Sequence, residues 1–164
     1  MATESPDQES APEAEDKATA ETEADKERRA EALRWLEQAE NDLVAARDNI
    51  AAKHYNWACY MSEQAGEKAV KAVYVFRAHP FKRIHWIADL ISGDELRGLP
   101  GVPELKDLVD IARQLDQMLT STRYPDAVPG SALPSQFYVE YEAEECLQWA
   151  QQIVASVRSI LPAT

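Results

Sequence analysis

The residues best suited to bind a ligand form a tetrapeptide, Arg123-Tyr124-Pro125-Asp126, between two predicted helices. Proline restricts its own φ and disfavours a helical conformation in the residue before it, so the chain must leave the helix here. The turn therefore presents a guanidinium, a phenol and a carboxylate from a restricted backbone. A guanidinium can bind phosphate through two parallel hydrogen bonds, and a tyrosine ring can stack on a nucleobase.

Two lysines on one predicted helix could add positive charge to the same site. Gln64, Lys68 and Lys71 follow one another at steps of four and three residues, which places them on one helix face. Together with the arginine of the turn, they predict a pocket for a phosphate group. The residues predicted to bind this ligand are Lys68, Lys71, Arg123, Tyr124 and Asp126.

The same residues also have structural explanations. Lys71 could pair with Glu67, one turn earlier, on a solvent-exposed helix face. Arg123 could bind the last carbonyl groups of the helix before the turn, where the helix dipole favours a cation. Asp126 could hold Arg123 or cap nearby backbone amides. The residues alone leave both interpretations open.

Patterns for metal binding and cofactor chemistry are weak. His85 and Asp89 lie one helical turn apart, but two ligands are too few for a metal site, and no third residue joins them at a suitable spacing. The chain has only five glycines, none in a phosphate-binding loop pattern. We therefore expect no metal site and no cofactor.

Acidic residues are concentrated at the start of the chain. The 164 residues carry a formal net charge of −12, of which residues 1–29 contribute −6, from ten acidic and four basic residues. Residues 1–27 contain no Ile, Leu, Val, Phe, Trp or Tyr, which predicts a disordered acidic tail. Residues 28–164 form the predicted domain. They contain no basic stripe, so we expect no strong binding to duplex DNA.

Four amphipathic patterns predict the helices that position the candidate residues. Apolar residues recur at steps of three and four along Leu36–Ile50, Tyr55–Arg77, Leu105–Leu119 and Val139–Ile160. The last of these helices is predicted to begin near Ser135, after the loop that contains Pro129, Gly130 and Pro134. The second pattern is rich in alanine, which allows close approach of neighbours and predicts a central helix. The run Ile84–Ile91 predicts a short extra helix. Because no segment alternates with period two, we predict an all-α fold, an antiparallel up-and-down four-helix bundle with one short additional helix.

The cysteines and the apolar segments indicate in which compartment of the cell the protein is expected. Cys59 and Cys146 both fall within apolar helical patterns, which favours two buried, reduced thiols. No segment approaches the length of a membrane span, and no signal peptide is recognisable. We expect a cytoplasmic protein without a membrane partner.

The second helical pattern also resembles a family signature. Residues 64–72, Gln-Ala-Gly-Glu-Lys-Ala-Val-Lys-Ala, are very similar to the QA-x-EKA-x-KA signature of HEPN domains. Residues 35–43 resemble the first helix of this family, and residues 85–90 resemble its short helix that begins with histidine. The Arg-Tyr-Pro-Asp turn resembles that of one subgroup. The resemblance spans roughly residues 30–162.

This resemblance implies a helical bundle that forms homodimers with a cleft near the two-fold axis. Many members are metal-independent ribonucleases, often toxins paired with a nucleotidyltransferase antitoxin, whereas others bind nucleotides. The ribonucleases carry an Arg-x(4–6)-His motif on a late helix, but no histidine follows Arg97 in this chain. Arg47 and His54 have the required spacing, yet they lie at the junction of the first two predicted helices.

The family resemblance therefore favours a dimeric module that binds a nucleotide or an RNA phosphate, works with a nucleotidyltransferase-family partner and is not catalytic. One alternative is a metal-independent endoribonuclease of a toxin–antitoxin pair, with Arg123 and His85 as catalytic residues. Another is a dimerisation scaffold without a ligand. Four tryptophans and six tyrosines exceed the needs of one narrow core, which also favours an exposed interface.

Overall fold

The fold is all-helical, as predicted, in the part of the chain that the structure describes. This computed structural model describes residues 22–81 and 83–161. Apart from one isolated β-bridge between Asp94 and Leu99, every regular element there is helical. Most of the predicted disordered tail lies outside the described residues. Its last residues are helical, because the first helix begins at Glu23 with Thr22 as its N-terminal cap.

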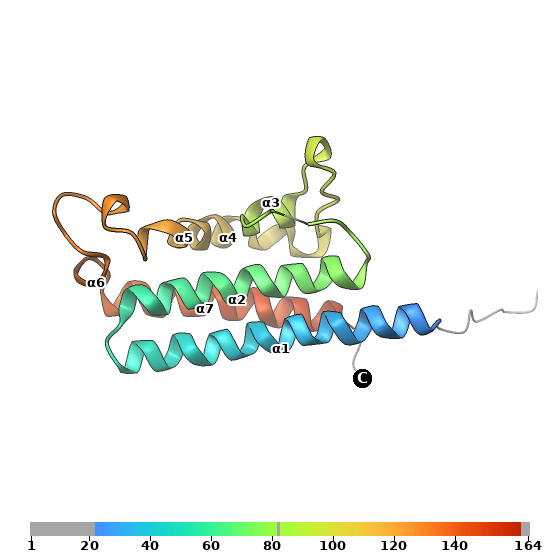
Figure 1. Cartoon of the computed structure of the whole chain (residues 1–164), viewed down its shortest axis with the longest axis horizontal. Coiled ribbons are helices and arrows are strands. Elements are labelled where there is room, and N and C mark those ends of the chain that lie inside the picture. The colour runs from blue at the N-terminus through green and yellow to red at the C-terminus, as the bar shows by residue number, and fades with distance from the viewer. Residues whose placement is uncertain (1–21, 82, 162–164) are drawn as a thin grey trace, which may run out of the picture.

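Three long helices form the main body of the bundle (Figure 1). They are α1 (Glu23–Ala51), α2 (Tyr55–Phe76) and α7 (Glu140–Ile160). Helix α2 runs antiparallel to α1, and α7 packs against both. This arrangement places the N-terminal ends of α2 and α7 at the same end of the molecule as the C-terminal end of α1.

A layer of short helices covers another side of α2 and returns the chain to the start of α7 (Figure 1). Its elements are α3 (Ile87–Ser92), η1 (Glu95–Arg97), η2 (Pro103–Leu108), α4 (Val109–Asp116), α5 (Met118–Ser121), η3 (Pro125–Ala127) and α6 (Pro134–Phe137). The segment from η2 to α5 supplies the third long pass of the predicted up-and-down bundle.

Two of the predicted long helices are interrupted. The third one begins as the 3₁₀-helix η2, with Pro103 at its first position, and becomes α-helical only at Val109. The last was predicted to begin near Ser135, but α6 ends at Phe137 and the backbone at Tyr138 and Val139 is extended. The Glu142 carboxylate then accepts the Val139 amide at 3.0 Å, which starts α7 as a new helix.

Helix α2 is the central helix, as its alanine content predicted. It contacts α1, α7 and the four short helices α3, α4, α5 and α6. A Cβ atom added at Gly66 would lie 3.0 Å from Ile87 Cδ1, 3.5 Å from Leu115 Cδ1 and 3.6 Å from Ile153 Cδ1. Three neighbouring helices therefore meet at this glycine. Four alanines of α2 are fully buried: Ala58, Ala65, Ala69 and Ala72.

The cysteines behave as predicted, since Cys59 on α2 and Cys146 on α7 are both buried and not linked to each other. Within the described ranges, no helix combines the length and the apolar character needed to cross a bilayer.

Replacement of Gly66 by valine is expected to destabilise the fold. The larger side chain would clash with groups from α3, α4 and α7 at the distances given above, and overpacking of this kind costs about 2 kcal/mol in a well-packed core. Urea unfolding followed by circular dichroism measures the effect. The matched control is Gln148→Val on the exposed face of α7, which should change the free energy of unfolding by less than about 0.5 kcal/mol. Equal stability of the two variants would contradict the packing described for Gly66.

Candidate functional site

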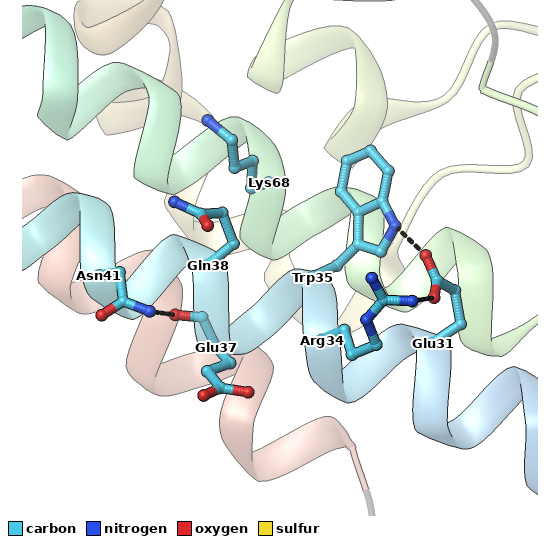
Figure 2. Close-up of a pocket in the computed structure, with 7 residues that line it drawn as sticks. All are labelled: Glu31, Arg34, Trp35, Glu37, Gln38, Asn41 and Lys68. Carbon is cyan, nitrogen blue, oxygen red and sulfur yellow. Dashed lines mark hydrogen bonds and ion pairs between the residues drawn. The ribbon is translucent and has the colours of Figure 1, made fainter.

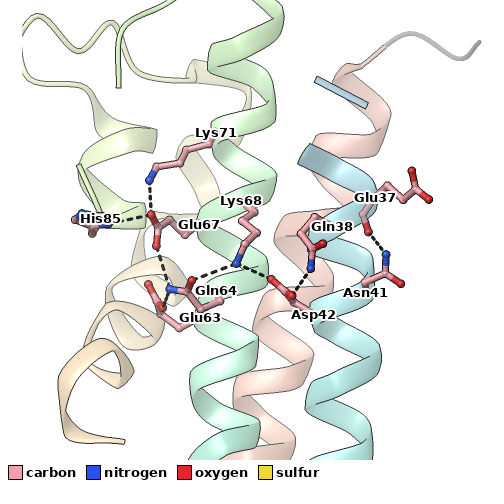
Figure 3. Close-up of polar contacts among 10 residues, drawn as sticks. All are labelled: Glu37, Gln38, Asn41, Asp42, Glu63, Gln64, Glu67, Lys68, Lys71 and His85. Atoms are coloured by element: carbon pink, nitrogen blue, oxygen red, sulfur yellow. Dashed lines mark hydrogen bonds and ion pairs between the residues drawn. The ribbon is translucent and has the colours of Figure 1, made fainter. Parts of the chain in front are cut away.

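One face of α2 carries a connected row of polar side chains (Figure 3). Gln64, Lys68 and Lys71 share this face, as their spacing predicted. The Glu67 carboxylate is the centre of the row. Its Oε1 accepts a hydrogen bond from Lys71 Nζ and lies 3.2 Å from His85 Nδ1, and its Oε2 accepts from Gln64 Nε2 at 3.2 Å.

Lys71 is held inside the protein by its ion pair. The pair with Glu67 is the one that the structural alternative predicted. The predicted solvent-exposed face is wrong, however, because Glu67 and Lys71 are only 6% and 7% exposed. Lys71 Nζ also lies 5.5 Å from the centre of the Phe81 ring, which favours the cation further. Removal of either charge would leave the other buried and unpaired.

Lys68 points towards α1 and keeps part of its donor capacity. Its Nζ lies 2.7 Å from Asp42 Oδ2 and donates to Gln64 Oε1 at 3.1 Å. An ammonium group has three N–H donors, so one remains. No further acceptor for it occurs among residues 22–81 and 83–161. Because the Lys68 side chain is about one-quarter exposed, the third N–H is available to a ligand.

A pocket of about 460 Å³ opens beside Lys68, on the face of α1 (Figure 2). Trp35 forms an aromatic wall, and its indole Nε1–H donates to Glu31 Oε1 at 3.0 Å. The Phe81 ring packs edge-on against this indole, with 5.5 Å between the ring centres. The residues that line the pocket are Glu31, Arg34, Trp35, Glu37, Gln38, Asn41 and Lys68. Of these residues, only Lys68 was predicted from the sequence to bind a ligand.

Arg123 and its turn lie elsewhere, beside the first turns of α2. Arg123 Nε and Nη2 donate to the Leu119 carbonyl at 2.8 and 2.5 Å, which is the contact that the structural alternative predicted. The guanidinium also packs against two rings, at 4.7 Å from the centre of Tyr60 and 5.0 Å from that of Tyr124. Asp126 is exposed and forms no hydrogen bond to Arg123.

The structure thus divides the predicted binding residues into two groups. Tyr60, which contacts Arg123, precedes Lys68 by eight residues, which corresponds to about 12 Å along an α-helix. Arg123 and His85, the pair of the ribonuclease alternative, are also apart within one chain, because His85 contacts Glu67 and Arg123 contacts Tyr60. Lys68 and Lys71 form one group, and Arg123, Tyr124 and Asp126 form the other.

Glu63 is the polar residue that sequence reasoning missed. Its side chain is fully buried, its Oε2 accepts from Gln64 Nε2 at 2.8 Å, and its Oε1 has no partner in the described part of the chain. A signal for this burial exists in the sequence. Glu63 lies at steps of four and three from Cys59 and Gly66, both of which are buried.

Burial controls the protonation of the carboxyl groups at this side of α2. Loss of water, together with the nearby carboxylates of Glu67 and Asp116, raises the pKa of Glu63 from 4.5 to about 8, although the hydrogen bond from Gln64 opposes this shift. Burial also raises the pKa of Asp116 to about 6, although the Ile87 and Ala88 amides donate to it at 2.6 and 3.0 Å. No three acidic, histidine or cysteine side chains in the described ranges are arranged to hold a metal ion.

Comparisons with known proteins establish the family. The HEPN domain model matches residues 32–160. This chain belongs to the HEPN family. The crystal structure of TT1696 from Thermus thermophilus is 39% identical, covers 78% of this chain and 96% of its own, and superposes with a TM-score of 0.67. The structure of ST0689, an archaeal HEPN homologue, is 33% identical, covers 80% of this chain and 98% of its own, and has a TM-score of 0.63.

A relative in Methanocaldococcus jannaschii bears the name "Putative toxin MJ1304". It is 29% identical over 131 residues, which cover 77% of this HEPN chain and 86% of that protein. The HEPN model starts within α1 and ends at the last residue of α7.

Replacement of Glu63 by the neutral glutamine is expected to make the free energy of unfolding depend less on pH. The folded-state pKa of about 8 lies above the ordinary value of 4.5, so the folded state binds more protons than the unfolded state between these values. The contribution of Glu63 to the free energy of unfolding is therefore largest below pH 4.5, and this contribution is lost as the pH rises to 8. The loss is on the order of 5 kcal/mol. Chemical denaturation of wild type and Glu63→Gln from pH 5 to 9 measures it.

The glutamine variant should gain stability relative to wild type as the pH rises, because its amide does not ionise. Its amide oxygen can still accept the hydrogen bond from Gln64. Glu144→Gln, on an exposed position of α7, is the control and should follow the wild-type curve. Parallel curves for wild type and Glu63→Gln would show that Glu63 has an ordinary pKa.

Proposed function

We propose that this HEPN protein is a binding module that takes a nucleotide or the phosphate of an RNA segment in the pocket beside Lys68. The observation that carries this proposal is the third N–H donor of Lys68, which has no acceptor in the described part of the chain and belongs to a side chain that lines the pocket and is about one-quarter exposed. Asp42 and Gln64 hold this ammonium in place. A phosphate oxygen can therefore bind without displacing either partner.

The other groups around the pocket support a nucleotide-sized ligand. A volume of about 460 Å³ lies within the range of small-molecule sites. Gln38 and Asn41 use their amide N–H groups on Asp42 and on the Glu37 carbonyl, so their side-chain oxygens remain as acceptors for a base. Arg34 uses one N–H on Glu31, and the rest of its guanidinium is exposed.

The second group of candidate residues belongs to the same proposal if the ligand is RNA. A stacked strand rises about 3.4 Å per nucleotide, so about four nucleotides span the 12 Å along α2 from Lys68 to the contact of Tyr60 with Arg123. Tyr124 is about half-exposed and offers a ring for stacking, and Asp126 offers an acceptor. Lys71 acts by fixing Glu67 rather than by contacting the ligand.

The proposal includes a homodimer and a nucleotidyltransferase-family partner, as family membership suggests. Exposed aromatic side chains support self-association, among them Trp57 at 44% and Trp86 at 46% exposure.

Thermal-shift titration with AMP, ATP and a short oligoribonucleotide tests the binding site. We expect Lys68→Ala to weaken binding about 10-fold or more, because a charge-assisted hydrogen bond contributes about 1.5–3 kcal/mol. The exposed Lys106 on η2 provides the control variant Lys106→Ala, which should bind as wild type does. The ligand-induced shift, rather than the melting temperature itself, is compared, since loss of Lys68 also leaves Asp42 unpaired.

Arg123→Ala separates the two ligand classes. It should weaken the oligoribonucleotide and leave AMP unaffected if RNA spans both groups. The absence of a shift with every ligand, or equal shifts for wild type and Lys68→Ala, would refute the proposed site.

A second candidate function, metal-independent ribonuclease activity, is favoured by the geometry of His85. Its Nδ1 lies 3.2 Å from the buried Glu67 carboxylate, and its side chain is 60% exposed. A carboxylate that orients one ring nitrogen leaves the other free as a proton donor or acceptor. The relative named as a putative toxin is consistent with this candidate.

Incubation with structured and single-stranded RNA in a chelator tests this second candidate. Cleavage that His85→Ala reduces by about 100-fold or more, as loss of a general acid or base does, would establish it. His54→Ala, at the start of α2, should keep the activity. If the wild-type protein leaves RNA intact, or if both variants cleave equally, His85 has no catalytic role.

A further inference from the structure

The segment from Leu133 to Tyr141 exposes an unusual number of apolar side chains. It contains four of the nine large hydrophobic side chains that are exposed in the described chain, within nine consecutive residues. Their exposed fractions are 48% for Leu133, 41% for Phe137, 53% for Val139 and 66% for Tyr141. The segment comprises α6 and the start of α7, at the end of the bundle shared with the start of α2 (Figure 1). We call these four residues the α6–α7 patch.

Buried neighbours hold the patch in its outward orientation. Tyr138 is only 5% exposed, and its hydroxyl is 2.6 Å from Ser121 Oγ. Because the backbone is extended at Tyr138 and Val139, consecutive side chains alternate in direction, and the inward Tyr138 turns Phe137 and Val139 outward. Pro134, at the start of α6, is buried as well. These buried residues fix the backbone of the segment, and the fixed backbone keeps the side chains of the patch exposed.

Along this segment of the chain the charge has one sign. Between Arg123 and Arg158 the sequence contains no lysine or arginine, but it contains Asp126, Glu140, Glu142, Glu144 and Glu145. The Glu142 carboxylate accepts the Val139 amide, and Glu145 accepts from the Tyr141 hydroxyl at 2.8 Å. Glu140 and Glu144 are exposed and form no ion pair within the described residues. Two carboxylates beside the apolar side chains are therefore available for a cationic partner.

We propose that the α6–α7 patch docks a basic amphipathic helix of a partner protein. The apolar face of such a helix covers Phe137 and Tyr141, and its flanking lysine or arginine side chains pair with Glu140 and Glu144. Aromatic residues are the types most enriched in such interfaces. The charge of the segment argues against two other occupants, because the same segment of a second copy would bring carboxylates against carboxylates, and a nucleic acid would bring phosphates. This surface is separate from the Lys68 pocket, none of whose lining residues belongs to it.

Fluorescence anisotropy with the full-length protein tests the proposal. The probe is a fluorescein-labelled synthetic helix with leucines on one face and lysines on the other. We expect saturable binding that Phe137→Ser/Tyr141→Ser weakens at least 10-fold and that Glu140→Gln/Glu144→Gln weakens about 3- to 10-fold with a reduced salt dependence. Tyr141→Ser alone, at the most exposed of the four positions, should weaken binding measurably even if the double variant misfolds.

Leu96→Ser is the matched control, because Leu96 is a fully exposed hydrophobic residue on η1, outside the patch. It should bind the basic helix as wild type does. A peptide with glutamates in place of the lysines should not bind. The proposal is overturned if the acidic peptide binds equally, if the patch variants bind as wild type does, or if the basic helix does not bind. Sedimentation completes the test, because patch variants that convert a dimer to a monomer would identify a second copy as the occupant.

Discussion

Folding removes the Glu67 carboxylate from water, and the polar side of α2 is arranged to satisfy it. Lys71, Gln64 and His85 all direct a polar atom at this one group. With its amide N–H committed to Glu67 and Glu63, Gln64 presents its carbonyl oxygen to Lys68. Lys68 in turn reaches Asp42 on α1. A single buried charge thus sets side-chain orientations from the start of the short-helix layer to the first helix, including the one ammonium group that lines the pocket.

The arrangement of helices was predictable because it depends on local repetition. Apolar residues at steps of three and four identify the buried stripe of each long helix, and the small residues of α2 identify the helix that neighbours approach most closely. The exact ends of the short helices were harder to predict. The start of α3 depends on the Asp116 carboxylate, which caps the Ile87 amide from 29 residues further along the chain. No periodicity within residues 84–91 contains that information.

In the candidate site, too, features set by local spacing could be predicted, whereas contacts between distant segments could not. The common face of Lys68 and Lys71 follows from spacing, but their partners follow from the register of α1 against α2, which places Asp42 beside Lys68. The pocket is formed mostly by polar residues of α1 at steps of three and four from Glu31 to Asn41. This spacing places them on one helix face, but a polar face of this kind is also what any solvent-exposed helix carries. For Arg123, the contact with the Leu119 carbonyl could be predicted, because it is local and follows from the chemistry of helix ends. Its separation from the two lysines could not be predicted, because it depends on the packing of the whole fold.

The interrupted layer from η2 to α5 also has a consequence for how the molecule assembles. Helices this short have little stability on their own, so Leu105 and Leu115 can be held in place only after α2 and α7 provide a surface. The α1–α2 hairpin, by contrast, consists of two long helices joined by a three-residue connection at Ala52–His54 and needs only contacts close in sequence. We therefore expect the hairpin to be the folding nucleus and the short-helix layer to be the last part to acquire protection against amide hydrogen exchange.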